Sequence, residues 1–183
     1  MRIAVLAVAA ALCATAAAAC PDDDAQRRVL DRINRQRGEG VRCGAQWHAA
    51  VPPLGWSDAV AAVAQAHAQA MARSQRLGHE DESGRDGGRR LADAGLEGSA
   101  WAENLARGRV DGQRLVALWF GSAGHCANLM LAGVSHAGLG CARGADGDDY
   151  WALLLWRPRS VSRATGSPTA TTRNPPAAVP RHD

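Results

Sequence analysis

The sequence of 183 residues contains no lysine, a single tyrosine and a single phenylalanine. Its basic side chains, histidine aside, are all arginines, and the formal net charge is only +3. A charge excess this small does not supply the basic footprint that binds nucleic acid, so we expect no nucleic-acid partner. We attribute the missing lysine, together with the abundant alanine and glycine, to compositional bias of the source rather than to function.

Several local catalytic motifs are also missing. No pair of histidines has the H-E-x-x-H spacing of a zinc protease, and no glycine-rich phosphate loop is present. Ser122 lies in "GSAG" and not in the G-x-S-x-G turn that activates a serine nucleophile. No two cysteines lie two to four residues apart, as they do in structural zinc sites. Any metal or catalytic site must therefore be assembled from distant parts of the chain.

The only long apolar run is at the start, where residues 1–19 predict an export signal. Arg2 provides the charged beginning, an apolar core follows, and alanines precede a cut before Cys20. A retained membrane anchor is the alternative, although the stretch is short for a full span. Lipid modification of Cys20 is another, weakened by Ala17 at the position three residues earlier. We expect a mature chain without a transmembrane span, secreted or in the periplasm or cell envelope.

Cleavage of the signal removes Cys13 and leaves an even number of cysteines, which predicts disulfides in an exported chain. Four cysteines allow three pairings. We expect Cys126–Cys141 together with Cys20–Cys43. The first bridge would close a loop of about 15 residues, which contributes roughly 3 kcal/mol in the chain-entropy model.

One domain is predicted over residues 20–157. Residues 158–183 are rich in Ser, Thr, Pro and Ala and lack apolar periodicity, so we expect a disordered tail. Within the domain His67 falls on the apolar stripe of a helix, which predicts a buried core histidine. Capping residues and periodicity predict helices over 22–40, 57–76, 88–95 and 111–122. A hairpin of strands is predicted over 135–142 and 148–156. The class is therefore α+β, with helices around a small, mainly antiparallel sheet.

Four polar side chains are the candidates for a shared site: His79, Glu103, Ser122 and His125. Two neutral imidazoles and one carboxylate can hold a divalent transition metal and leave coordination positions open. Alternatively, a histidine oriented by a carboxylate can act as a general base. A third alternative is structural, with His–Glu hydrogen bonds that only brace the fold. Spacing alone does not choose among them.

The chain resembles the CAP superfamily, the SCP-like domains of cysteine-rich secretory proteins, antigen 5 and plant pathogenesis-related proteins, in its short bacterial secreted branch. The resemblance covers about residues 25 to 156, and its segments come in the family's order. They are "VLDRINRQR", "PLGWSDAVAAVAQAHAQAMA", "GHEDESGRDGGRRLADAG", "AENLARG", "GHCANLM", "AGLGCA" and "YWALLLW".

This resemblance implies a three-layer α-β-α sandwich with a central groove lined by two histidines and two glutamates. The matching motifs carry His79, Glu103 and His125 onto that groove. The family's second glutamate follows a helical tryptophan by three residues, and here Trp119 is followed at that distance by Ser122. The missing carboxylate weakens a two-carboxylate acid/base mechanism. It harms a metal site of His79 and His125 less, because water can complete the coordination.

The family's biochemistry is diverse and does not point to one activity. We therefore expect a secreted, monomeric binding domain rather than an enzyme. The expected partner is a small or lipid-like ligand, or another component of the cell envelope, and zinc or another divalent ion is the expected cofactor. An extracellular hydrolase, either metal-dependent or using a His/Glu general base, is the alternative.

Overall fold

The structure is a computed structural model that describes residues 20–159. The predicted export signal over 1–19 and the predicted tail from residue 160 onward lie outside the described residues. Within them the helices agree with the predicted ones to within a few residues, and a further short helix carries His125. The helices are α1 (Asp23–Glu39), α2 (Asp58–Ser74), α3 (Gly87–Asp93), α4 (Gly112–Gly121) and α5 (Ala123–Leu129). None of the described helices is long and apolar enough to cross a membrane.

A four-stranded sheet runs through the centre, with the strand order β3-β5-β6-β4. The strands β5 and β6 form the predicted antiparallel hairpin, β6 also pairs antiparallel with β4, and the short β3 pairs parallel with β5. Their bounds are β3 (Gly55–Trp56), β4 (Gly98–Arg107), β5 (His136–Arg143) and β6 (Asp149–Pro158). A separate small hairpin of β1 (Val41–Cys43) and β2 (Gln46–His48) was not predicted, because strands this short carry no readable alternation.

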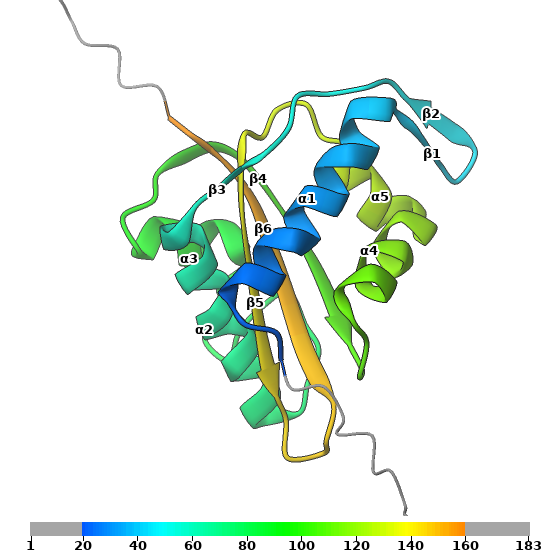
Figure 1. Cartoon of the computed structure of the whole chain (residues 1–183). Coiled ribbons are helices and arrows are strands. Elements are labelled where there is room, and N and C mark those ends of the chain that lie inside the picture. Colours follow the sequence, from blue (N-terminus) through cyan, green and yellow to red (C-terminus); the bar gives the residue numbers. More distant parts are fainter. Residues whose placement is uncertain (1–19, 160–183) are drawn as a thin grey trace, which may run out of the picture.

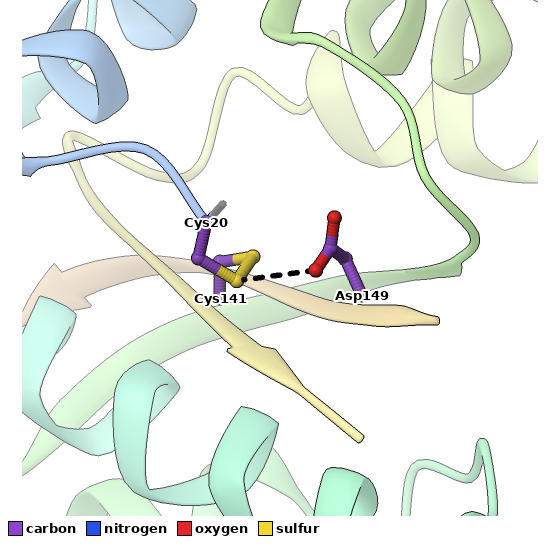
Figure 2. A group of neighbouring side chains, drawn as sticks. All are labelled: Cys20, Cys141 and Asp149. Carbon is purple, nitrogen blue, oxygen red and sulfur yellow. Dashed lines mark hydrogen bonds between the residues drawn. A yellow bond between two sulfur atoms is a disulfide. The ribbon is translucent and has the colours of Figure 1, made fainter. Parts of the chain in front are cut away.

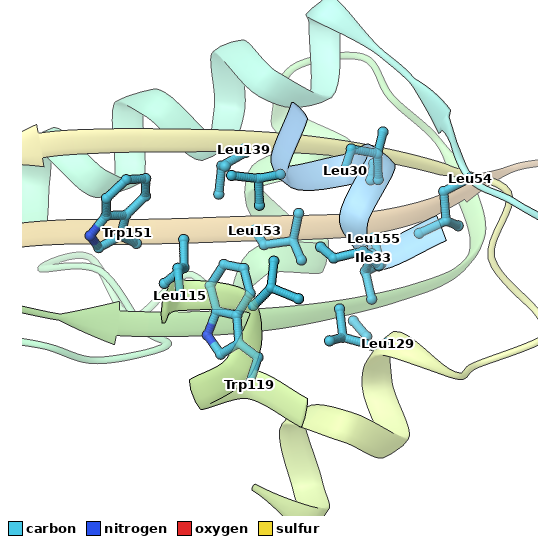
Figure 3. Close-up of a cluster of buried hydrophobic side chains, with 14 of the residues drawn as sticks. Leu30, Ile33, Leu54, Leu115, Trp119, Leu129, Leu139, Trp151, Leu153 and Leu155 are labelled. Atoms are coloured by element: carbon cyan, nitrogen blue, oxygen red, sulfur yellow. The ribbon is translucent and has the colours of Figure 1, made fainter. Parts of the chain in front are cut away.

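Helices cover both faces of the sheet, as Figure 1 shows. On one face, residues of α1, α4 and α5 pack with Trp151, Leu153 and Leu155 of β6 (Figure 3). On the other face, residues of α2 and α3 pack with the alternate residues Tyr150, Ala152 and Leu154. A strand buried on both faces reads as a continuous apolar run, which explains "YWALLLW". The fold is therefore the predicted three-layer α-β-α sandwich, of mixed α and β composition.

Helix α2 lies unusually close to the sheet because β5 has glycines where the two meet. A Cβ atom added at Gly140 would lie 2.4 Å from the Cα atom of Gln65. The helix begins at the predicted cap, Ser57, whose hydroxyl accepts from the backbone N–H of Val60 at 3.3 Å. His67 is 2% exposed, which confirms the predicted core position. Its Nε2 lies 2.9 Å from the carbonyl oxygen of Gly78, so it holds the loop that follows α2.

The described cysteines form two disulfides, but the predicted pairing is wrong. The bridges are Cys20–Cys141 and Cys43–Cys126. Bridged Cα atoms must lie within about 7 Å of each other. Cys126 of α5 lies in a small cluster with Cys43 of β1, whereas Cys141 of β5 lies in the main core cluster, against which Cys20 packs. The short chain separation between Cys126 and Cys141 is therefore not a short distance in space.

Candidate functional site

The predicted site residues lie around one open groove of about 490 Å³, which we call the histidine groove. It is contributed by the loop after α2, by β4 and by the beginning of α5. Because β4 is the last strand in the sheet order, its outer edge is free of a further strand among the described residues, and the groove lies there. The side chains that matter below are His79, Trp101, Glu103, Ser122, His125 and Asn128.

Glu103 is the most constrained of these residues. Its side chain is 1% exposed, and each of its carboxylate oxygens has its own partner. Arg90 of α3 donates from Nη2 to Oε1 at 2.5 Å, and Oε2 lies 2.9 Å from Nδ1 of His79. Arg90 also donates from Nη1 to the carbonyl oxygen of His79 at 2.9 Å. The guanidinium therefore fixes both the carboxylate and the backbone of the histidine that the carboxylate contacts.

This arrangement decides how His79 presents its ring. A carboxylate held by an arginine accepts hydrogen bonds and does not donate them, so Nδ1 of His79 carries the hydrogen. In the neutral form of the ring, the other nitrogen, Nε2, then keeps its lone pair. The His79 side chain is 60% exposed, in contrast to the buried Glu103. The pair therefore offers an oriented nitrogen ligand or base at the surface of the groove.

His125 comes to the groove from α5, on the other side of β4, and two asparagines hold it there. Asn104, which follows Glu103 on the strand, donates from Nδ2 to the carbonyl oxygen of His125 at 3.0 Å. Asn128 donates to Oδ1 of Asn104 at 3.0 Å and to the carbonyl oxygen of Glu103 at 3.2 Å. Burial, and to a smaller extent the nearby His79, lowers the pKa of His125 below its usual value of about 6.5. The neutral imidazole is therefore the form present at neutral pH.

Ser122 lies where α4 ends and α5 begins, with an extended backbone between them. Its side chain makes no capping hydrogen bond to α5. The hydroxyl lines the groove beside His125, at the position that the resemblance gives to a second glutamate. The structure thus brings all four predicted residues to one groove, with a hydroxyl in place of a second carboxylate.

Sequence reasoning missed three residues that assemble the site: Arg90, Asn104 and Asn128. Arg90 is 8% exposed and Asn104 is fully buried, so both are polar groups that the fold must pair. A signal for Asn104 was present in "AENLARG", because strand alternation sends Glu103 and Asn104 to opposite faces. Arg90 had no such signal. Three arginines lie between residues 85 and 90, and the sequence does not indicate which of them is buried.

A different cluster has the tightest grouping of metal-ligand atoms. Among residues 20–159, the single set of three His, Cys, Asp or Glu side chains whose ligand atoms all lie within 4.8 Å of one another is Cys20, Cys141 and Asp149. Figure 2 shows the two sulfurs joined in a disulfide beside the carboxylate, with Sγ of Cys20 3.6 Å from Oδ1 of Asp149. Metal ions bind thiolates and not disulfide sulfurs, so this cluster is a structural disulfide beside a carboxylate and not a metal site. A lipid anchor at Cys20 would be attached through the sulfur of this residue, and in the structure that sulfur is bonded to Cys141.

The ligand atoms of the histidine groove are less tightly grouped. His79, Glu103 and His125 do not form such a set of three, although His79 and Glu103 are 2.9 Å apart. Both oxygens of Glu103 are already engaged, by Arg90 and by His79. In this conformation Glu103 therefore orients His79 and is not itself placed to share a metal ion with both histidines. This favours the orienting role over the ligand role for the carboxylate.

Comparison with known families agrees with this architecture. Residues 30–155 match the profile of the Cysteine-rich secretory protein family, CAP. The chain belongs to the CAP family. The match spans β4 and α5 and hence the whole groove. A comparison of the sequence with curated proteins gave no significant match.

Solved structures of CAP proteins share the fold. An outer surface protein of Borrelia burgdorferi is 17% identical, with a TM-score of 0.66 over 78% of this chain and 99% of that one. An extracellular protein of Bacillus anthracis that contains an SCP domain is 23% identical, with a TM-score of 0.60 over 74% of this chain and 41% of that one. A cysteine-rich secretory protein of Staphylococcus aureus is 17% identical, with a TM-score of 0.55 over 73% and 38%. This chain therefore spans less than half of the latter two proteins.

Proposed function

We propose that this CAP domain acts outside the cytoplasm as a binding protein whose histidine groove holds a divalent metal ion and a small ligand from the cell envelope. Zinc is the first candidate for the metal. Nε2 of His79 and the imidazole of His125 would be its protein ligands, Glu103 would orient His79, and water would complete the coordination. The two disulfides are consistent with an oxidising compartment.

The observation that carries the metal proposal is the chain of contacts from Arg90 through Glu103 to His79. A histidine whose Nδ1–H is held by a carboxylate is the usual form of a zinc-binding histidine. The lowered pKa of His125 supports the second ligand, because metal binding requires neutral imidazole. Support also comes from the CAP-fold structure titled NaASP2 with Zn²⁺, which is 12% identical and has a TM-score of 0.52.

Calorimetric titration of the mature protein with zinc chloride at pH 7.5 tests this proposal. We expect one site in the wild type, and loss of at least tenfold in affinity for both His79→Ala and His125→Ala. The matched control is His48→Ala, because His48 lies on β2 and does not line the groove. Absence of zinc binding by the wild type, or equal affinity in the two groove variants and the control, would refute the metal site.

A hydrolase has less support from the geometry. The only carboxylate among the groove residues defined above is Glu103, and both of its oxygens are engaged. Ser122 provides no second acid or base. Binding is therefore the function that the groove supports best.

A further inference from the structure

Two tryptophans extend the histidine groove in a direction that the metal proposal does not use. Trp101 of β4 lines the histidine groove and also a second open hollow of about 430 Å³, which we call the tryptophan hollow. Trp156 of β6 lines this hollow too, and it is the register partner of Trp101 across the two strands. Directly opposed residues of an antiparallel pair project from the same face of the sheet. The two indoles therefore project from the same face of the sheet into the tryptophan hollow, and Trp101 also borders the histidine groove.

Glycines leave room for both indoles. A Cβ atom added at Gly88 would lie 2.3 Å from Nε1 of Trp101, and one added at Gly87 would lie 3.0 Å from its Cζ3. A Cβ atom added at Gly98 would lie 2.5 Å from Nε1 of Trp156. Two of these glycines, Gly87 and Gly88, are the first residues of α3. Their lack of side chains lets Trp101 pack against the beginning of the helix, and the residue remains 42% exposed.

The rim of the tryptophan hollow is polar and its charges are balanced. Nε of Arg89 lies 3.0 Å from Oδ1 of Asp93, and Nη1 of Arg159 lies 3.4 Å from Oε2 of Glu97. Each rim arginine therefore has an acidic partner, so the rim does not select for an anionic ligand. The hollow is also open rather than an enclosed apolar channel of the kind that shields an acyl chain. A neutral ligand with one apolar face and many hydroxyl groups fits both features.

We propose that the tryptophan hollow and the histidine groove form one binding track for a neutral oligosaccharide, with a pyranose ring stacked on Trp101. A pyranose ring presents C–H groups on its face, which the electron-rich face of an indole attracts, and hydroxyls on its edge. The rim carboxylates and guanidinium groups can accept from and donate to these hydroxyls. This inference rests on the proposed function of the groove as a ligand site, and it names the class of that ligand.

Titration with the β-1,4-linked tetramer of N-acetylglucosamine, followed by calorimetry and by tryptophan fluorescence, tests the inference. We expect wild-type affinity in the range of about 0.1–1 mM, weak because few groups are desolvated at an open site. Trp101→Ala should weaken binding by up to about tenfold, the scale of one lost aromatic contact, and Trp101→Tyr should restore most of it. Gly88→Ala should also weaken binding, because its methyl group displaces an indole that is still present. Trp47→Ala is the matched control, since Trp47 is 58% exposed on β2 and lines neither hollow.

The outcomes separate this inference from the metal proposal. No binding of the tetramer by the wild type, or equal binding by Trp101→Ala and Trp47→Ala, would overturn the glycan track. Thermal unfolding of the Trp101→Ala variant shows whether the domain remains folded. Loss of glycan binding with an unchanged unfolding midpoint supports the inference. Failure of zinc binding in the wild type would remove the metal while leaving the glycan result to stand on its own.

Discussion

Arg90 and Glu103 form an ion pair in which Nη2 lies 2.5 Å from Oε1 and the side chains are only 7% and 1% exposed. The Coulomb attraction of such a pair is offset by the free energy of removing two charges from water. Removing one partner therefore has a larger effect than removing both. The pair links α3 to β4, and Glu103 also contacts His79. Loss of the pair should therefore change both the stability of the fold and the orientation of His79.

Replacing Arg90 with alanine should lower the free energy of unfolding by about 3–5 kcal/mol, because the buried Glu103 loses its arginine partner and keeps only the contact with His79. The double variant Arg90→Met/Glu103→Gln should lose much less. Urea denaturation of both variants checks this. Arg89→Ala is the control, since the Arg89 side chain is 70% exposed and its ion pair contributes at most about 1 kcal/mol. Equal losses for Arg90→Ala and Arg89→Ala would contradict the assigned role.

The disulfides should be found as Cys20–Cys141 and Cys43–Cys126 by mass spectrometry of non-reduced peptides. Replacing both cysteines of either bridge with serine should lower the free energy of unfolding by about 2–5 kcal/mol. The cysteines are separated by 121 and 83 residues, so each bridge closes a long loop in the unfolded chain. A peptide that links Cys126 to Cys141 would contradict the structure.

The fold was predictable because its local signals agree with one another. Ser57 caps α2, the apolar residues of that helix recur at helical spacing, and "YWALLLW" forms a strand buried on both faces. The resemblance to CAP proteins supplied the layers and the groove residues. The disulfide pairing was not predictable from chain separation. It depends on the packing of β1 against α5, which brings Cys43 to Cys126, and on the position of Cys20 beside β5, which brings it to Cys141. The role of Arg90 likewise depends on where α3 docks, and no local pattern reports that.

Replacing Gly140 with alanine should destabilise the protein by about 1–3 kcal/mol or more, because a methyl group does not fit between β5 and α2. Gly38→Ala is the matched control. A Cβ atom at Gly38 meets nothing within 4 Å, and alanine is the better helix former in α1. The control should therefore be neutral or slightly stabilising. Thermal unfolding of the two variants checks the contrast, and similar midpoints would show that α2 can move away from the sheet.

Stability should fall as the pH falls below about 6.5, partly because of His67. Burial, followed by the charge of Arg90, lowers the pKa of this histidine in the folded state. The unfolded chain, with a pKa of about 6.5, therefore binds more protons than the folded chain just below that pH. The contribution of His67 is complete above pH 6.5 and is lost as the pH falls through the folded pKa. Urea unfolding between pH 7.5 and 5 should show a smaller pH dependence in His67→Gln, and an unchanged dependence would refute this assignment.

Replacing Ser122 with glutamate should tighten zinc binding by the histidine groove. Ser122 lines the groove with His79 and His125, and its side chain makes no capping hydrogen bond to α5, so its replacement breaks no such contact. A carboxylate there adds a negative charge and an oxygen ligand, whereas the hydroxyl supplies neither charge nor a strong ligand. We expect an affinity gain of about tenfold, the size of one favourable charge contact in a partly solvated site.

Two control variants test whether the new carboxylate at position 122 binds the metal ion. Ser122→Gln has a similar size without the charge and should leave zinc affinity near the wild-type value. Ser122→Glu combined with His125→Ala should lose most of the gain if the new carboxylate and His125 share one ion. Calorimetry at pH 7.5 measures all three variants together with the wild type. Equal affinities for the glutamate and glutamine variants would mean that position 122 does not face the bound ion, and that the metal, if held by His79 and His125, lies away from the beginning of α5.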